Sequence, residues 1–377
     1  MDWNSIYTSY PVNRELIWLN NAGSVPAGDH IIRALSRFTE DYARKGIFSE
    51  FGNYINIQRT IKSILGELLN CSPDELCLVH NTAEGMNIIS HGLALSRDDE
   101  VILMENEFPS NVYPWWHLEK KGIKLLTAPM ETSPESFMKS LLGLITKKTR
   151  VISLSAVHWC TGMPLPLERI GRICKQEDIV FVVDAAQGAG MQPLDVRRAE
   201  ISFMAFSAWK WLMGPIGLGA LYVAEERLDD IETVFMGTAS VVKDKEFLPY
   251  KSELKPTADR FSVSTSSLVD WVYFEAALQF LRDIGFEPVQ DRIYTLSSHL
   301  RRRLTAAGYR VFSESFSDHP TGIVVCEKQD VEPRVIMEHL KKNKIVAAER
   351  LGRVRLSPHI YNSIEQLDTV ARVLEQI

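Results

Sequence analysis

Residues 180–219 read VFVVDAAQGAGMQPLDVRRAEISFMAFSAWKWLMGPIGLG, and this stretch decides the fold. It contains two apolar runs, at 179–183 and 201–206, and a charged residue follows each: Asp184 the first and Lys210 the second. Because the apolar residues are continuous rather than alternating, each run is typical of a strand that is covered on both faces. The pattern therefore predicts a largely parallel sheet with helices on both sides, the α/β layout.

The neighbouring sequence extends this pattern in both directions. Further strands are expected at 76–79, 100–104, 151–154 and 219–223, with helical patterns between several of them, such as 167–176. From about residue 265 the pattern changes to that of a smaller α+β unit. Its helices are expected at 268–284, 287–307, 332–343 and from 363, and its strands at 321–326, 345–348 and 353–356.

Composition excludes several classes of protein. The 377 residues are 45% hydrophobic and 24% charged, with a net charge of −6 and no basic run longer than 301–303. We therefore expect a globular protein without a nucleic-acid surface. Apolar stretches of about five to eight residues fall short of the ~20 that a membrane helix needs. Residues 1–4 lack the basic start of a signal peptide, so we expect none. Together with the short apolar stretches, this predicts that the protein has no membrane partner.

The cysteines indicate a reducing compartment. Five are present, an odd number, and their spacings match no metal site. We therefore expect a cytoplasmic protein with mostly buried thiols and no bound metal. The five are Cys71, Cys77, Cys160, Cys174 and Cys326.

The polar residues of the 180–219 stretch suggest a cofactor. A carboxylate at the end of a buried strand requires a partner, and the pyridine nitrogen of pyridoxal 5′-phosphate (PLP) would serve for Asp184. An ionised aspartate keeps that nitrogen protonated, which makes the ring an electron sink. Gln187 is placed to hydrogen-bond the ring hydroxyl. Lys210, among apolar neighbours, should have a depressed pKa, which suits an amine that forms a Schiff base.

Each charged residue taken alone has a plainer interpretation. An aspartate after a strand is often a helix cap, and a lysine after a strand is often a surface residue. Their occurrence together, in this order, with Gln187, Ser207 and the glycine-rich run at 214–219, favours a PLP site with Lys210 and Asp184 as catalytic residues.

At this point the sequence resembles the class V aminotransferase family of fold-type I PLP enzymes, which includes cysteine desulfurases, selenocysteine lyases, isopenicillin N epimerase-like proteins and kynureninases. The resemblance runs from 18–23 (WLNNAG) to 355–363 (RLSPHIYNS). It implies a large α/β domain at 20–255 with a mostly parallel seven-stranded sheet. It also implies a smaller α+β domain formed by 1–19 and 256–377.

The resemblance assigns cofactor contacts to further residues. Thr82 and Ala83 fall in the family's phosphate-binding turn, although a plain helix cap would look similar. Phe108 falls where the family stacks a residue on the PLP ring, and alone it would pass for a core residue. Ser207 matches a phosphate ligand. Trp209 stands before the lysine, where desulfurases usually have histidine, and its indole N–H remains a donor.

The resemblance also assigns a substrate side. Arg355 matches the arginine that binds the α-carboxylate as a bidentate pair, with Arg350 as a helper and Asn21 as a further substrate contact. His158 falls beside the cofactor, either as a contact or acid/base group or as an ordinary buried histidine. Thr265 lies in a segment that reaches the neighbouring subunit's site, which implies a homodimer.

The match departs from the desulfurases in one segment. Residues 347–355 (AAERLGRVR) contain no cysteine and no room for the loop that carries the sulfur-accepting thiol, and Cys326 lies earlier in an apolar run. We therefore expect a C–S β-lyase acting on an α-amino acid or a molecule that carries one. An aminotransferase, an epimerase or a non-catalytic PLP-binding protein are the alternatives. Residues 44–56, with Phe48, Phe51 and Tyr54, are expected to form either a packed amphipathic helix or part of the pocket.

Overall fold

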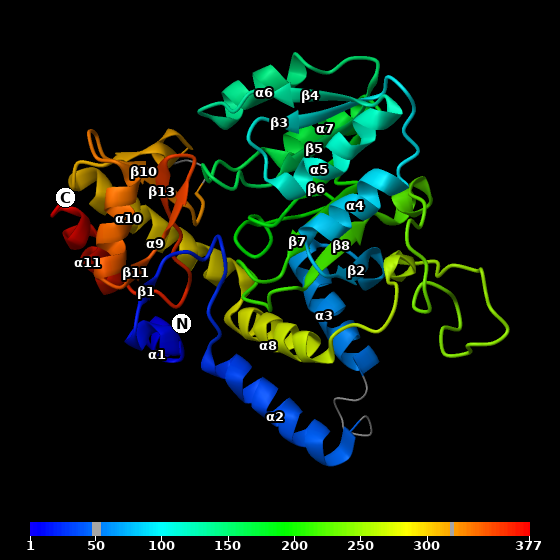
Figure 1. Cartoon of the computed structure of the whole chain (residues 1–377), viewed down its shortest axis with the longest axis horizontal. Coiled ribbons are helices and arrows are strands. Elements are labelled where there is room, and N and C mark those ends of the chain that lie inside the picture. Colours follow the sequence, from blue (N-terminus) through cyan, green and yellow to red (C-terminus); the bar gives the residue numbers. More distant parts are fainter. Residues whose placement is uncertain (47–53, 317–319) are drawn as a thin grey trace.

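The computed structural model describes residues 1–46, 54–316 and 320–377, and its centre is a seven-stranded sheet (Figure 1). The strand order is β2-β8-β7-β6-β5-β3-β4. Strand β8 is antiparallel to both of its neighbours, and the other pairs are parallel. The predicted mostly parallel sheet is confirmed. Its strands are β2 (Leu76–Val79), β3 (Glu100–Met104), β4 (Lys124–Ala128), β5 (Thr149–Ser155), β6 (Val180–Asp184), β7 (Phe203–Ser207) and β8 (Gly219–Val223).

Helices cover both faces of this sheet. Phe181 and Val183 pack into one core and Val182, between them, packs into another, so β6 is buried on both sides. On the first face lie α2 (Asp29–Lys45), α3 (Tyr54–Leu69), α7 (Leu167–Gln176) and α8 (Leu268–Ile284), and on the second lies α4 (Thr82–Gly92). This double burial explains why the strand is a continuous apolar run.

A second, smaller sheet stands beside the first. It is antiparallel, in the order β12-β13-β10-β9. Three helices pack with it, α9 (Phe286–Ala306), α10 (Pro333–Lys342) and α11 (Ile364–Leu374). Its strands are β9 (Arg310–Val311), β10 (Val324–Glu327), β12 (Ala348–Arg350) and β13 (Arg353–Leu356). The predicted α+β unit is therefore present.

The N-terminal segment joins this smaller unit. Strand β1 (Ile17–Trp18) pairs in parallel with β11 (Ile345–Val346), and Leu19 packs in the same core as α9 to α11. The strand expected at 345–348 is thus split between β11 and β12. The domain boundary at residue 256 remains a prediction, and α8 packs on α2 and α3 rather than on the small sheet.

The remaining elements are short. They are the helices α1 (Trp3–Thr8), α5 (Tyr113–Trp116) and α6 (Pro134–Leu142), and 3-10 turns at Pro11–Arg14, Pro73–Glu75, Pro109–Asn111, His117–Lys121, Glu225–Asp230, Ala258–Phe261 and Phe312–Phe316. Within the described ranges, no helix is long and apolar enough to cross a bilayer. Phe48 and Phe51, predicted as helix or pocket residues, lie outside the described residues.

Candidate active site

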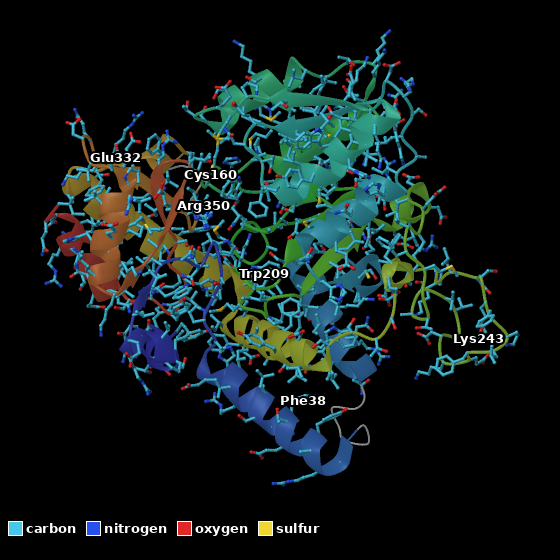
Figure 2. The ribbon with its side chains drawn as sticks, in the orientation of Figure 1. Phe38, Cys160, Trp209, Lys243, Glu332 and Arg350 are labelled. Atoms are coloured by element: carbon cyan, nitrogen blue, oxygen red, sulfur yellow. The ribbon has the colours of Figure 1, made fainter. Side chains whose placement is uncertain are left out.

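A cavity of about 430 Å³ lies between the C-terminal ends of β6 and β7 and the small sheet. Figure 2 places Trp209 and Arg350 in the space where the two units meet. The cavity brings together most of the predicted site residues, from segments far apart in the sequence. It is lined by Ala22, Gly23, Asn81, Thr82, Ala83, Phe108, Ser110, Trp159, Ala186, Gln187, Ser207, Trp209, Lys210, Arg350 and Arg355.

Lys210 enters the cavity from the turn after β7. Its side chain is buried, and its Nζ lies 5.5 Å from the centroid of the Phe108 ring. Burial, opposed by the charge of Asp184 and aided by the charges of Arg355 and Arg350, lowers the pKa of Lys210 to about 8. An amine with a lowered pKa is partly neutral near physiological pH, which is the form that attacks a carbonyl carbon.

Asp184 ends β6 and is 3% exposed. Its Oδ1 accepts from the backbone N–H of Ala186 at 2.9 Å, and its Oδ2 accepts from the Ser110 hydroxyl at 3.1 Å. Burial raises the pKa of Asp184, whereas these hydrogen bonds and the charge of Lys210 oppose the rise. A cationic ring nitrogen beside Asp184 would hold the carboxylate ionised. Ser110 was missed from the sequence, although it stands two residues after Phe108.

Gln187 is held in one orientation by its neighbours. Its Nε2 donates to the Ala22 carbonyl at 2.9 Å, and its Oε1 accepts from the Trp211 indole at 2.8 Å. A side-chain amide has two N–H hydrogens, so Gln187 could donate the second to a ring hydroxyl in the cavity, and this role remains a prediction.

The start of α4 lines one side of the cavity. Asn81 caps the helix by accepting from the Glu84 N–H at 2.9 Å, and Thr82 and Ala83 form the first turn. The free N–H groups and positive end of such a helix favour an anion. Across from them, the hydroxyl of Ser207 is buried and has no partner among the described residues. Both features suit a phosphate group.

Phe108 is paired with a residue that sequence reasoning missed. The ring of Trp159 meets Phe108 edge to face, with ring centroids 5.4 Å apart. The Trp159 indole N–H donates to the Asn106 carbonyl at 2.7 Å, which fixes the ring in place. Phe108 keeps 40% of its surface exposed, so an apolar face is open to a bound ring.

Arg355 is a buried cation that has no carboxylate partner among the described residues. It is 2% exposed; it donates to the Trp159 carbonyl at 2.6 Å and to Asn20 Oδ1 at 3.4 Å. Its Nε has no partner in the described part of the chain, and no ion pair of Arg355 occurs there. Burial lowers the pKa of Arg355 to about 10, and Arg350 adds to this shift. A substrate carboxylate would supply the missing counter-charge.

The two arginines flanking the β12–β13 turn face opposite ways. Arg350 lines the cavity, with its guanidinium 6.0 Å from the centroid of Trp159. Arg353 instead lies 3.6 Å from the centroid of the Phe312 ring and pairs with Glu327. Side chains two residues apart on a strand share a face, so alternation alone would place Arg353 beside Arg355, and the contact of Arg353 with Phe312 departs from that pattern at the start of β13.

Four predicted residues are not in the cavity lining: Asp184, whose partners Ser110 and Ala186 line it, and His158, Asn21 and Thr265. His158 hydrogen-bonds Asn106 O at 3.1 Å and Thr161 Oγ1 at 3.0 Å, and burial lowers its pKa to about 4. A neutral histidine with both nitrogens occupied matches the plainer interpretation, an ordinary buried histidine, and gives no support to an acid/base role.

The Asn21 side chain is likewise occupied. Its Nδ2 donates to the Ser357 carbonyl at 2.7 Å, and its Oδ1 accepts from the Tyr361 hydroxyl. The neighbouring Asn20, rather than Asn21, contacts Arg355. Asn21 therefore supports the wall of the site, and this geometry does not favour direct contact with a substrate.

Glu107 is a second buried carboxylate that the sequence did not single out. It is 6% exposed and accepts from the Ser155 N–H at 2.7 Å and the Ser155 hydroxyl at 2.5 Å. It also accepts from the Phe108 N–H at 3.2 Å, so it ties the Phe108 loop to β5. Burial raises the pKa of Glu107 to about 7, and the nearby Asp184 adds to the rise.

The residues present fit PLP. The cavity lining combines a buried lysine, an anion-binding helix start, a Ser207 hydroxyl without a partner among the described residues, and an apolar face on Phe108. The buried carboxylate of Asp184 is hydrogen-bonded to two lining residues, Ser110 and Ala186. When bound, this cofactor supplies an electron sink for the electrons of a broken Cα–H bond. Lys210 would hold it covalently, and Asp184, Gln187, Ser207 and the start of α4 would orient it.

Comparisons with known proteins agree with this assignment. A family model described as "Aminotransferase class-V" matches residues 17–372. A protein of Pyrococcus abyssi described as a probable cysteine desulfurase is 25% identical, over 97% of this chain and 95% of its own length.

Two solved structures of a protein called C-DES are also similar. One is a variant with glycine covalently linked to its PLP cofactor; it has a TM-score of 0.90 and is 24% identical, over 97% of this chain and 98% of its own. The other is described as a cystine C–S lyase with its product cysteine persulfide. It has a TM-score of 0.89 and is 24% identical, over 97% of this chain and 99% of its own. The predicted family, fold and cofactor are confirmed.

Proposed function

Because this chain belongs to the class V aminotransferase family, and is a PLP-dependent enzyme of the lyase or transferase type, we propose that it cleaves the C–S bond of a cysteine-derived amino acid by β-elimination. One S-substituted cysteine and one water would give a thiol, pyruvate and ammonium. The overall change is an elimination followed by hydrolysis, so it needs no oxidant or second amino acid.

One observation carries this proposal: none of the five cysteines lines the cavity in the part of the chain that the structure describes. Strands β12 and β13 are joined by a turn at Leu351 and Gly352, which leaves no room for a thiol-bearing loop beside Arg350. Cys160, near Arg355, is 3% exposed, and burial raises its pKa to about 12. A thiol in that state is a poor sulfur acceptor, so the sulfur would leave as a free thiol.

The residues of the cavity divide the work. Arg355 would hold the α-carboxylate, which orients the Cα–H bond towards Lys210. The Nζ of Lys210 would remove the proton from Cα, and the C–S bond electrons would leave with sulfur. Phe108 would supply an apolar face and no proton, so the departing sulfur would not be protonated from that side.

The test uses the purified holoenzyme with an S-substituted cysteine, cystine, cysteine and alanine in turn. Pyruvate and thiol should appear together, in equal amounts and over many turnovers. The matched control is the Lys210→Ala variant, which should release neither. Keto-acid-dependent amine transfer without thiol release would reject the proposal in favour of an aminotransferase. Loss of optical activity at Cα alone would reject it in favour of an epimerase.

We also propose that the protein acts as a homodimer in which Thr265 reaches the partner's cofactor site. Thr265 is exposed and lies apart from its own cavity, in a separate hollow of about 240 Å³ with Asp259 and Trp271. The segment before it projects from the molecule, as the position of Lys243 shows (Figures 1 and 2). This segment and the residues next to it expose large apolar side chains, namely Phe235, Met236, Phe247, Leu248, Tyr250 and Val263.

Exposed apolar patches of this kind mark interaction sites. Sedimentation of the holoenzyme should therefore give twice the mass of one chain. Thr265→Ala should keep this mass but weaken cofactor retention. A monomer that retains cofactor and turnover would contradict the dimer, and unchanged retention in the variant would contradict the role of Thr265.

A further inference from the structure

Beyond the C–S cleavage on which it rests, we infer that Trp159 and Phe108 form an aromatic wall that selects cysteine S-conjugates with an aryl group on sulfur. The wall is defined by these two side chains, and Arg350 lies over Trp159. Cysteine and S-alkyl cysteines with small substituents would be poorer substrates.

The position of the wall follows from Arg355. Its Nη1 donates to the carbonyl of Trp159, so the residue that holds the α-carboxylate is bonded directly to the residue that carries the indole. Phe108 lies 5.5 Å from the Nζ of Lys210, the group that takes the Cα proton. A substituent on Cβ would therefore start between the carboxylate anchor and the lysine, where both rings are within reach.

The wall offers carbon rather than polar atoms. The only polar atom of the Trp159 ring, its indole N–H, is already bonded to Asn106 at 2.7 Å. Phe108 has no polar atom on its ring, but one of its faces would meet the cofactor ring, so most of the surface left for a substituent comes from the half-buried Trp159. The remaining apolar surface is covered when an apolar group binds, and covering it favours binding in proportion to its area. An edge-to-face aromatic pair also favours a third ring over an alkyl chain.

The cleavage of the C–S bond also favours aryl substituents on the sulfur. Phe108 cannot protonate the leaving sulfur, and no carboxylate, cysteine or histidine lines the cavity among the described residues. The acid that the proposed mechanism supplies here is Lys210 after it has taken the Cα proton. A sulfur that depends less on this proton leaves more easily, and aryl thiolates are weaker bases than alkyl thiolates. Arg350 and Arg355 add positive charge on this side, which stabilises a thiolate. The binding of the aromatic ring and the departure of the sulfur thus both favour S-aryl cysteines.

The test compares three substrates, S-methyl-, S-benzyl- and S-phenyl-L-cysteine, in the holoenzyme. S-benzyl-cysteine separates ring binding from leaving-group acidity, because its thiol is an alkyl thiol. The kcat/KM should rise from methyl to benzyl by about 10- to 100-fold, the value of burying one ring, and again from benzyl to phenyl.

Trp159→Ala should lower kcat/KM far more for the benzyl compound than for the methyl compound, mainly through KM, and so remove most of the advantage of benzyl over methyl. Trp159→Phe keeps an aromatic ring and should retain part of the advantage of benzyl over methyl. This conservative variant keeps the test valid if Trp159→Ala folds poorly. Trp116→Ala is the matched control, because this tryptophan is 57% exposed and lies outside the cavity lining.

A second readout does not depend on elimination. Phenylalanine and alanine should each change the visible absorbance of the bound cofactor, with phenylalanine saturating at a lower concentration in wild type but not in Trp159→Ala. If this preference appears without thiol release, the aromatic wall stands and C–S cleavage fails. If thiol is released from methyl and benzyl substrates with equal kcat/KM, C–S cleavage stands and the aromatic wall is overturned.

Discussion

The two ends of the cavity are built in different ways. The cofactor end comes mainly from β6, β7 and the turns after them, which carry Asp184, Gln187, Ser207 and Lys210 within one stretch of the chain. The substrate end comes from the Phe108 loop, the turn at Trp159 and the β12–β13 strands of the other sheet. The first end depends on the order of strands in one sheet, whereas the second exists only where two sheets meet.

This difference predicts different outcomes for substitutions at the two ends. Changes at the cofactor end should abolish chemistry with every substrate. Changes at the substrate end should alter which substrates react and how tightly they bind.

The largest effect is expected for Lys210→Ala. Removing the amine removes both the covalent link and the base, so turnover should fall by about 10⁴-fold or more. Turnover is measured as pyruvate release, and circular dichroism checks that the fold is kept. Lys175→Ala, on the exposed surface of α7, is the control and should behave as wild type. Wild-type turnover in Lys210→Ala would refute the central assignment.

Asp184→Asn should lower kcat by roughly 10²- to 10³-fold and loosen the cofactor. An amide cannot hold a proton on the ring nitrogen by charge, so the electron sink weakens. Cofactor loss on dialysis and single-turnover rates measure the two effects. Asp178→Asn makes the same chemical change at an exposed position just before β6 and should have no effect. Equal kinetics in both variants would mean that Asp184 has no role in the chemistry.

Arg355→Lys tests the substrate end. Lysine keeps the charge but loses the paired N–H groups, so kcat/KM should fall by about 10- to 100-fold while cofactor retention is unchanged. Arg353→Lys is the control, because Arg353 packs on Phe312 away from the cavity. If Arg355→Lys instead released the cofactor, the division between the two ends would be wrong.

The pH dependence of cofactor uptake sharpens the assignment of Lys210. The neutral amine attacks the cofactor, so the uptake rate of the cofactor-free protein should rise with pH around the pKa of about 8 and level off above it. With that pKa, the rate at pH 7 is about a tenth of the plateau. Stopped-flow absorbance measures the rate. A midpoint near 10 would mean that burial does not lower this pKa.

The smallest effect is expected for Glu107→Gln. Folding raises the pKa of Glu107 to about 7, so the native state holds a proton that the unfolded state loses at lower pH. The contribution of protonated Glu107 to the free energy of unfolding is therefore complete in acid and is lost as pH rises through 7. The melting temperature of the Glu107→Gln holoenzyme, relative to that of wild type, should increase by a few degrees between pH 5 and pH 8. A difference that does not vary with pH would contradict the protonated state.

Much of the fold could be predicted from local sequence. The strands at 100–104 and 219–223 have the predicted bounds, because continuous apolar runs are required where both faces of a sheet are covered. The strand expected at 201–206 begins instead at Phe203, since Ser202 is used in a hydrogen bond to the Phe181 N–H that starts the pairing with β6. Such boundary shifts reflect contacts between strands, which no local pattern contains.

The turn after β5 explains why His158 was singled out and Trp159 was missed. Gly162 has a φ of +74°, and a Cβ there would meet Ile323 Cβ at 2.8 Å. The turn therefore packs tightly against the residue that precedes β10. The tight turn directs His158 into the core and Trp159 into the cavity. A one-residue difference of this kind depends on backbone direction, and the sequence alone does not specify it.

The sequence by itself determined the sheet and the cofactor, and it placed Asp184, Gln187, Ser207 and Lys210, the residues proposed to hold that cofactor, on consecutive elements whose spacing follows from strand and turn lengths. Only the tertiary structure decided the substrate end. There, the meeting of two sheets brings Arg355 to the carbonyl of Trp159 and Trp159 to the ring of Phe108. These contacts join residues that are far apart in the chain, and their geometry is set by packing between units rather than by local preference.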